Sequence, residues 1–413
     1  MARQFEESKK KKKSLNKRIL KYTGITFLLL LIIAIALPFI FKDKLIEVVK
    51  EEVNDNVNAI VEFGDFDLSI IKSFPNFSFE IKDITIDGKD KFEGTRLASI
   101  KNTEITLDIM SVISGDKIEI KKIGIIDPNF YVIVDEDSNA NYDIAIPTSD
   151  TILATEQTDE LKYSIGLQKL IVTNANLVYK DEISGMTSEI KNLNYNLSGD
   201  FTQNNFDTKN KITVDELSFG MGGINYLTKS KVDLVAEVNV DKFVKYTLKE
   251  NNLKLNELDL AMDGWVELKE NSTDMDMNFD SKKTTFKSIL SLVPAVYSRS
   301  FSTIKTKGKL ALNGNLKGSM TETEFPSFNA KMNVTDGYFK YPDLPNSADN
   351  IDVIAAISHP QGDLDKMKID VQKLHLELAD NPVDANIMAT NPISDPNIIS
   401  KIKADIEIDK LKS

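Results

Sequence analysis

The chain has 413 residues, no cysteine and a formal net charge of −12 at pH 7. Residues 1–21 carry nine basic and two acidic side chains, a net charge of +7, so residues 22–413 carry −19. An acidic body argues against nucleic-acid binding, which needs Lys and Arg to neutralise phosphates. The lack of cysteine excludes disulfides, a cysteine nucleophile, a thiolate metal site and a lipid-modified N-terminal cysteine.

Residues 22–41 form an apolar stretch without a single charge. A helix of twenty residues spans about 30 Å, the thickness of the hydrocarbon core of a membrane. The basic residues before it favour a cytoplasmic N-terminus and a body on the other side. A cleaved signal peptide is the alternative, but its apolar region is usually shorter, about 7–15 residues. We therefore expect a cytoplasmic tail at 1–21 and a single membrane anchor at 22–41.

From residue 61 onward apolar residues recur at every second position. This alternation is typical of half-buried β-strands, and about 18 such runs are separated by short turns. Within residues 79–86, 118–125 and 170–179 the alternation shifts by one residue, which predicts β-bulges. We expect a mainly β fold: an elongated, twisted antiparallel sheet with few short helices.

Helices and a linker interrupt this pattern. The spacing of apolar residues predicts three helices, at 42–60, 241–250 and 287–297. Residues 148–160 are polar, acidic and without a clear period. They predict a linker between a first strand segment at 42–147, which includes the first helix, and a second segment at 161–413.

The apolar face of such a sheet cannot remain in water. The predicted helices are too few to cover it, which leaves a sandwich closed on itself or a sheet curled into an apolar groove. About 18 strands spaced about 4.8 Å apart extend over roughly 85 Å, a length that suits lipid acyl chains. The candidate groove residues come from the early strands. They are Phe79, Ile81, Ile84, Ile86, Ile105, Leu107, Ile118, Ile120, Ile123 and Ile125.

Few residues suggest catalysis. His359 and His375 are the only histidines, and neither a nucleophile elbow nor an HExxH motif accompanies them. We expect them to be surface or strand residues, and Trp265, the only tryptophan, to be a groove or core residue. We predict no enzyme activity, no catalytic residue and no cofactor.

A group of acidic and amide side chains resembles the first half of a calcium loop. It consists of Asp135, Asp137, Asn139 and Asn141. An EF-hand needs Gly at its sixth position and Glu at its twelfth, where this chain has Ala140 and Ile146. We therefore expect a hairpin turn and no metal site.

Several stretches together resemble the AsmA family of envelope proteins, especially its Bacteroidetes-type forms. They are FGDFDLSIIKSFPNFSFEIKDITIDG at 63–88, LASIKNTEITLDIMSVISGDKIEIKKIGIIDPNF at 97–130, LKLNELDLAMDGWVEL at 253–268, ILSLVPAVYS at 289–298 and GYFKYPDLP at 337–345. Members of this subgroup are often longer, so a short paralogue or an incomplete chain is expected.

The resemblance implies a β-groove of the bridge-like, repeating-β-groove lipid-transfer type. It further implies a protein of the bacterial inner membrane whose body lies in the periplasm and serves lipid transfer and outer-membrane homeostasis or assembly. The expected partners are a phospholipid or other acyl lipid and the inner membrane, with outer-membrane or other envelope proteins as further candidates. A scaffold that binds protein partners through exposed sheet edges is the alternative.

Overall fold

The computed structural model describes most of the chain after residue 49. The described residues are 50, 53–69, 73, 76–114, 118–146, 163–164, 167–281, 285–292, 304–321, 324–340, 345–392 and 394–407. The expected tail at 1–21, the anchor at 22–41 and the linker at 148–160 lie outside them. Among the described residues, no helix has both the length and the apolar character needed to cross a membrane.

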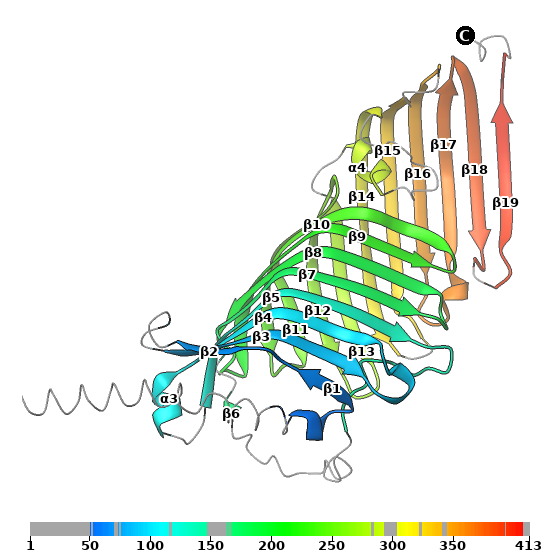
Figure 1. Cartoon of the computed structure of the whole chain (residues 1–413). Coiled ribbons are helices and arrows are strands. Elements are labelled where there is room, and N and C mark those ends of the chain that lie inside the picture. Colours follow the sequence, from blue (N-terminus) through cyan, green and yellow to red (C-terminus); the bar gives the residue numbers. More distant parts are fainter. Residues whose placement is uncertain are drawn as a thin grey trace, which may run out of the picture.

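The described residues form a single sheet of nineteen strands (Figure 1). The strands are β1 (Ala59–Glu62), β2 (Phe66–Ser69), β3 (Phe77–Gly88), β4 (Arg96–Leu107), β5 (Ile118–Val134), β6 (Tyr163–Ser164), β7 (Lys169–Asp181), β8 (Met186–Gly199), β9 (Asn205–Met221), β10 (Ile224–Asp241), β11 (Lys245–Leu255), β12 (Leu258–Leu268), β13 (Thr273–Ser281), β14 (Lys305–Met320), β15 (Ser327–Lys340), β16 (Ala348–His359), β17 (Lys368–Leu378), β18 (Asn381–Thr390) and β19 (Asn397–Ala404).

The strands follow one another in space almost in chain order. β1 and β2 both pair with β3, and β3, β4 and β5 are antiparallel neighbours. From β7 to β19 each strand pairs antiparallel with the next. The exception is β5, which is parallel to β6 and β7. Because β5 and β7 pair directly, the strand segments on either side of residues 148–160 form one continuous sheet.

The sheet is long, open and twisted, as the alternation predicts. In Figure 1, β3–β5 and β7–β10 cross the view while β16–β19 stand nearly upright. Neighbouring strands of a sheet are rotated by roughly 20–25° relative to each other, and the rotation accumulates over many strands.

Bulges are present at the predicted shifts on β5 and β7, whereas on β3 the register with β4 is unbroken from Lys82 to Ile84. Asp83 on β3 and Asn174 on β7 have positive φ angles of 53° and 54°. In the run 118–125, the neighbours Thr106 and Leu107 of β4 pair with Lys122 and Ile120 of β5. Lys121 is therefore the extra residue of a bulge on β5. We call the aligned positive-φ residues on β3, β5, β7 and β8 the bulge row. They are Asp83, Asp127, Asn174 and Asn192.

The predicted helices agree only in part with the described residues. The helix expected at 241–250 is wrong, because β10 ends at Asp241 and β11 begins at Lys245 after a tight turn. Lys242 and Phe243 in that turn have positive φ angles, which a helix does not allow. In the expected helix at 42–60, residues 53–56 are helical, but Ala59–Glu62 form β1 and pair with β3.

Within the described part of the chain, four short helical segments have defined bounds. They are α3 (Ile109–Ser114), α4 (Phe286–Leu290) and the 3₁₀ turns η1 (Asp90–Phe92) and η4 (Leu364–Lys366). The helix expected at 287–297 is thus present as α4 but ends at Leu290. Phe286 of α4 packs into a buried cluster with residues of β12, β14, β15 and β16. The other cluster members are Leu258, Leu310, Val334 and Ile351. A sealed core therefore lies under α4, at the later strands.

Candidate functional site

One face of the sheet collects the apolar side chains of successive strands. Phe79 on β3 pairs with Ile105 on β4, which pairs with Ile123 on β5. Ile123 in turn pairs with Leu170 on β7. Directly paired residues of neighbouring strands point to the same side of a sheet. We call this side the apolar face and the opposite side the outer face.

The bulge row keeps the apolar face in phase along each strand. On β3, Phe79 and Ile81 precede Asp83 and are paired with Ile105 and Thr103, while Ile84 and Ile86 follow it. With strict alternation, the side chains after Asp83 would point to the outer face. The change of phase at Asp83, where φ is positive, therefore keeps apolar side chains on one face along the strand.

The ten candidate groove residues lie along these paired rows. Leu107 on β4 pairs with Ile120 on β5, and Ile125 pairs with Thr103 and Val172. Nine of the ten side chains are partly exposed, and none of the nine is buried or fully exposed. For the tenth, Ile118, the structure describes the backbone, which pairs with Tyr163 of β6.

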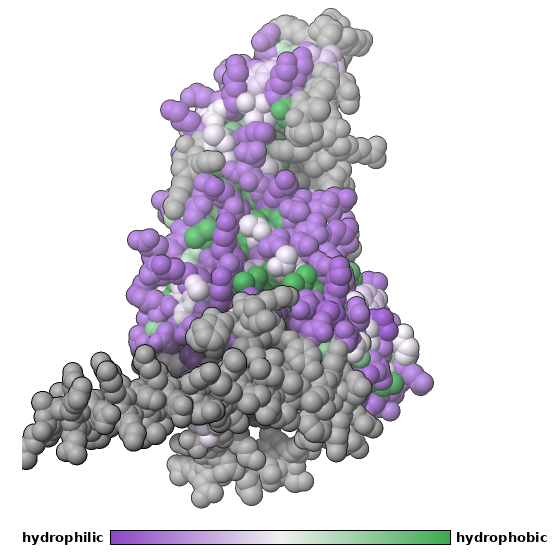
Figure 2. All heavy atoms as spheres, turned by 60° about the vertical axis from the view of Figure 1, so that its left-hand side comes forward, coloured by the Kyte–Doolittle hydropathy of each residue, from purple (hydrophilic) through white to green (hydrophobic). Residues whose placement is uncertain are grey.

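The outer face of the same strands is polar. Lys82 Nζ lies 2.5 Å from a carboxylate oxygen of Asp67, and Lys122 Nζ lies 2.8 Å from one of Glu104. In Figure 2 hydrophobic residues form a broken band through the middle of the view, bordered by hydrophilic residues. The outer face of these strands is therefore suited to contact with water, and the apolar face to contact with an apolar ligand.

A short polar chain interrupts the apolar face at β8 and β9. The Tyr195 hydroxyl donates to Oδ1 of Asn210 at 2.9 Å, and Nδ2 of Asn210 donates to Oγ1 of Thr208 at 3.0 Å. Burial raises the pKa of the Tyr195 phenol. None of these three residues is among the candidates predicted from the sequence. The available signal was that Thr208 and Asn210 occupy the alternate positions of β9 that are apolar in other strands.

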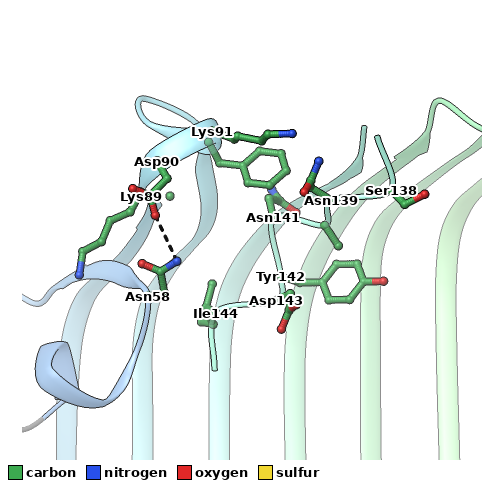
Figure 3. A pocket seen from close by; sticks show the side chains of 13 residues that line it. Asn58, Lys89, Asp90, Lys91, Ser138, Asn139, Asn141, Tyr142, Asp143 and Ile144 are labelled. Atoms are coloured by element: carbon green, nitrogen blue, oxygen red, sulfur yellow. Dashed lines mark hydrogen bonds between the residues drawn. The ribbon is translucent and has the colours of Figure 1, made fainter. Parts of the chain in front are cut away.

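A separate cavity of about 550 Å³ lies where β3 ends, beside the loop that follows β5 (Figure 3). Its lining is mostly polar, with Asn58 Nδ2 donating to a carboxylate oxygen of Asp90 at 3.4 Å. Lys91, which also lines it, pairs with Asp137 at 3.0 Å. These lining groups bond to each other or to the adjacent loop.

Comparison with protein families decides the assignment. A model of the AsmA family matches residues 16–411, which is nearly the whole chain. This chain belongs to the AsmA family. No curated protein and no solved structure matches it. The resemblance read from the five short stretches is thereby confirmed.

In this AsmA-family chain, the segment that resembles the first half of a calcium loop forms a turn, as predicted. Oδ1 of Asp135 accepts the backbone N–H groups of Asp137 at 3.0 Å and Asn139 at 2.8 Å. Nδ2 of Asn141 donates to the backbone carbonyl of Tyr131 at 2.7 Å. In the part of the chain that the structure describes, no group of His, Asp and Glu side chains is arranged to hold a metal ion.

Both histidines of this AsmA-family chain lie on strands. His359 is buried at the end of β16, with its ring nitrogens 3.1 Å from the Pro326 carbonyl oxygen and 2.8 Å from that of Asp363. His375 on β17 lies 2.8 Å from a carboxylate oxygen of Asp384.

The expectation for Trp265 is wrong. On β12 the apolar face carries Leu260 and Val266, so Trp265 points to the outer face, beside the direct partners Thr247 and Asp276. There the Nζ of Lys245 lies 4.4 Å from the centre of its ring.

Proposed function

We propose that the apolar face binds lipid acyl chains and that the twisted sheet curls around them as a groove. In this proposal residues 22–41 anchor the protein in the bacterial inner membrane, with its N-terminus in the cytoplasm and its body in the periplasm. The protein contributes there to phospholipid transfer and to outer-membrane homeostasis or assembly. Membership of the AsmA family, whose proteins are associated with the cell envelope, supports this placement.

The observation that carries the proposal is the partial exposure of large apolar side chains on β3, β4 and β5. Side chains such as Phe79, Ile105 and Ile123 are directly paired yet not buried by the rest of the described chain. Each methylene group removed from water contributes about 0.8 kcal/mol. An acyl chain laid across these strands would therefore gain from its own burial and from that of the apolar face.

The energetics allow movement as well as binding. Apolar contacts are non-directional, so an acyl chain can shift along the paired rows without breaking a specific polar bond. Apolar contacts alone give this movement no direction. In this proposal the direction of transfer has to come from outside the apolar face.

Photo-crosslinking to lipid tests the proposal. With p-benzoylphenylalanine in place of Phe79, the full-length protein in its native membrane should form an adduct with phospholipid on illumination, identified by mass spectrometry. Ile125→Glu, on the apolar face of β5, should abolish most of this adduct, because it places a charge in the acyl-chain path. A charge at Leu107 or Ile120 should act in the same way.

Ile126→Glu is the matched control. Ile126 is the next residue of β5, is exposed, and points to the outer face beside Asn102. This variant should keep the adduct, and both variants should remain folded by circular dichroism. Equal adduct yields from Ile125→Glu and Ile126→Glu would overturn the proposal.

A scaffold that holds envelope proteins is the alternative function. The exposed last strand, β19, is the observation that favours it, since such an edge can pair with another strand. Two results together would favour the scaffold. Changes in β19 would remove a co-purifying protein, and the lipid adduct at Phe79 would be non-specific, with equal yields from Ile125→Glu and Ile126→Glu.

A further inference from the structure

The outer edge of β19 has no strand partner within the described part of the chain. β19 pairs with β18 along its whole length, from Ala404 opposite Val383 to Asn397 opposite Thr390. It stands at the end of the sheet in Figure 1. All eight residues of β19 are exposed, and Ile402 keeps 65% of its surface. The backbone groups along such an edge are ready to form a further ladder.

The backbone groups that face outward can be assigned. The N–H of Asp405 donates to the carbonyl of Pro382 at 3.1 Å, which directs Asp405 toward β18. In an antiparallel pair the N–H and C=O of alternate residues point to opposite sides. Those of Ile402, Ala404 and Ile406 therefore point away from β18, toward the free edge.

The charges along this edge alternate with apolar residues in a self-complementary order. Lys401 and Lys403 are followed at the same spacing by Asp405 and Glu407, and all four are exposed. Lysine on an edge strand usually prevents pairing with another strand. Here the two acidic residues reverse that effect, because an antiparallel copy of the same segment places acid opposite base.

The charge order selects one register. With two copies antiparallel and Ala404 opposite Ala404, each Lys403 faces Asp405 of the other copy, and each Lys401 faces Glu407. Centring the pair on Lys403 would set Lys403 opposite itself, and centring it on Ile402 would set Lys401 opposite Lys403. Like charges directly opposite each other destabilise a strand pair.

The apolar residues fit the same register. Ile402 pairs with Ala385 of β18 and lies on the apolar face. Ile406 follows four residues later, an even spacing that places it on the same face of an extended strand. Centred on Ala404, Ile402 of each copy faces Ile406 of the other. Both side chains are at least half exposed, at 65% and 50%, so the contact would cover apolar surface that is now in water.

We propose that β19 pairs with β19 of a second copy of this chain, antiparallel, around a two-fold axis at Ala404. The axis is perpendicular to the local sheet, so the apolar faces of the two copies continue on the same side. The inference rests on backbone direction and charge order, and it holds whether or not the apolar face binds lipid.

A single cysteine tests the register directly, because the chain has no cysteine of its own. In Ala404→Cys the two new thiols are opposite each other in a hydrogen-bonded pair, with Cα atoms about 5.5 Å apart. This separation lies within the range of about 4.4–6.8 Å that a disulfide spans. Mild oxidation of the full-length protein in native membranes should therefore give a disulfide-linked dimer on a non-reducing gel.

Lys401→Cys is the matched control. In the proposed register it lies six residues from its own counterpart, roughly 20 Å along the strand, and should stay monomeric under the same oxidation. Ala404→Cys that stays monomeric both on oxidation and with a short thiol-to-thiol crosslinker would overturn the proposal, because Cβ atoms in a hydrogen-bonded pair lie slightly farther apart than in a relaxed disulfide. So would equal dimer yields at 401 and 404, which would indicate random collision.

A charge exchange tests the pairing. In the Ala404→Cys background, Lys403→Asp should lower the dimer yield at least several-fold, because it faces Asp405 of the other copy. Adding Asp405→Lys restores opposite charges in every 403–405 pair and should recover the yield. An unchanged yield in the single exchange, or no recovery in the double exchange, would contradict the register. Lipid adducts at Phe79 report separately on the proposed function.

Discussion

Asn174 on β7 donates a hydrogen bond from Nδ2 to Oδ1 of Asp127 on β5, with the two atoms 3.1 Å apart. Both residues have positive φ angles, 54° and 50°. Asn and Asp adopt this conformation more readily than other residues with a side chain, because they bond to nearby polar groups. The bulge row thus places positive-φ residues at the same level on β5 and β7, and the register of these two strands is the same on both sides of them.

Asn174→Val should lower the free energy of unfolding by about 1–3 kcal/mol, because a β-branched residue is strained at positive φ and the bond to Asp127 is lost. Urea unfolding of the detergent-solubilised protein, followed by circular dichroism, measures the change. Asn174→Gly loses the same hydrogen bond without the strain and should cost clearly less. Equal losses would show that the backbone conformation contributes little.

Gly264→Ala should destabilise the pairing of β12 with β13 by at least about 2 kcal/mol. Gly264 has φ of 130°, and an added Cβ would lie 2.0 Å from the carbonyl oxygen of Asp276. The control is Gly222→Asn, at φ of 57° with open space around the Cβ position, which should change stability by less than about 0.5 kcal/mol. Thermal unfolding of both variants tests this, and a neutral Gly264→Ala would count against the close approach of the two strands.

Leu310→Ala should cost about 2–5 kcal/mol, because it leaves a cavity in the cluster under α4. Leu310 is 1% exposed and packs with Phe286 of that helix. Ile354→Ala removes a similar side chain that is 42% exposed on β16 and should cost well under half as much. Denaturant titration of both proteins compares them. Similar losses would mean that α4 does not seal a core.

The ion pair between Lys373 and Asp352 should make stability depend on acid pH. The hydrogen bond from Lys373 Nζ, at 2.8 Å, holds the pKa of Asp352 below its ordinary value. A lowered folded-state pKa stabilises the fold above the unfolded value, about 4, and this contribution is lost as the pH falls through the folded value.

Lys373→Met should therefore be less stable than the parent protein at pH 7, by under about 1 kcal/mol because the pair is largely exposed. The difference should disappear as the pH falls well below 4. Urea titrations over this pH range measure it, with Lys373→Arg as the control that keeps the charge. A difference that does not vary with pH would rule out the ion pair as its cause.

Local pattern predicted much of this fold. The alternation of apolar residues located the strands, and the phase shifts around Asp83 and Asn174 located residues with positive φ, because side-chain direction in a strand repeats every two residues. The ten candidate residues were found in the same way. The expected helix at 241–250 shows the limit: Val244 and Leu248 are four residues apart, a spacing that a turn followed by a strand can also produce.

The amino-acid sequence by itself determined which residues are apolar, where the alternation changes phase, and that 401–407 carries two basic residues followed by two acidic ones. Tertiary structure alone decided that β5 pairs with β7 across residues 148–160, that Trp265 points outward, and that α4 covers Leu310. The physical reason is that each of these depends on which distant strands share backbone hydrogen bonds, and the register of that pairing decides which side chains meet.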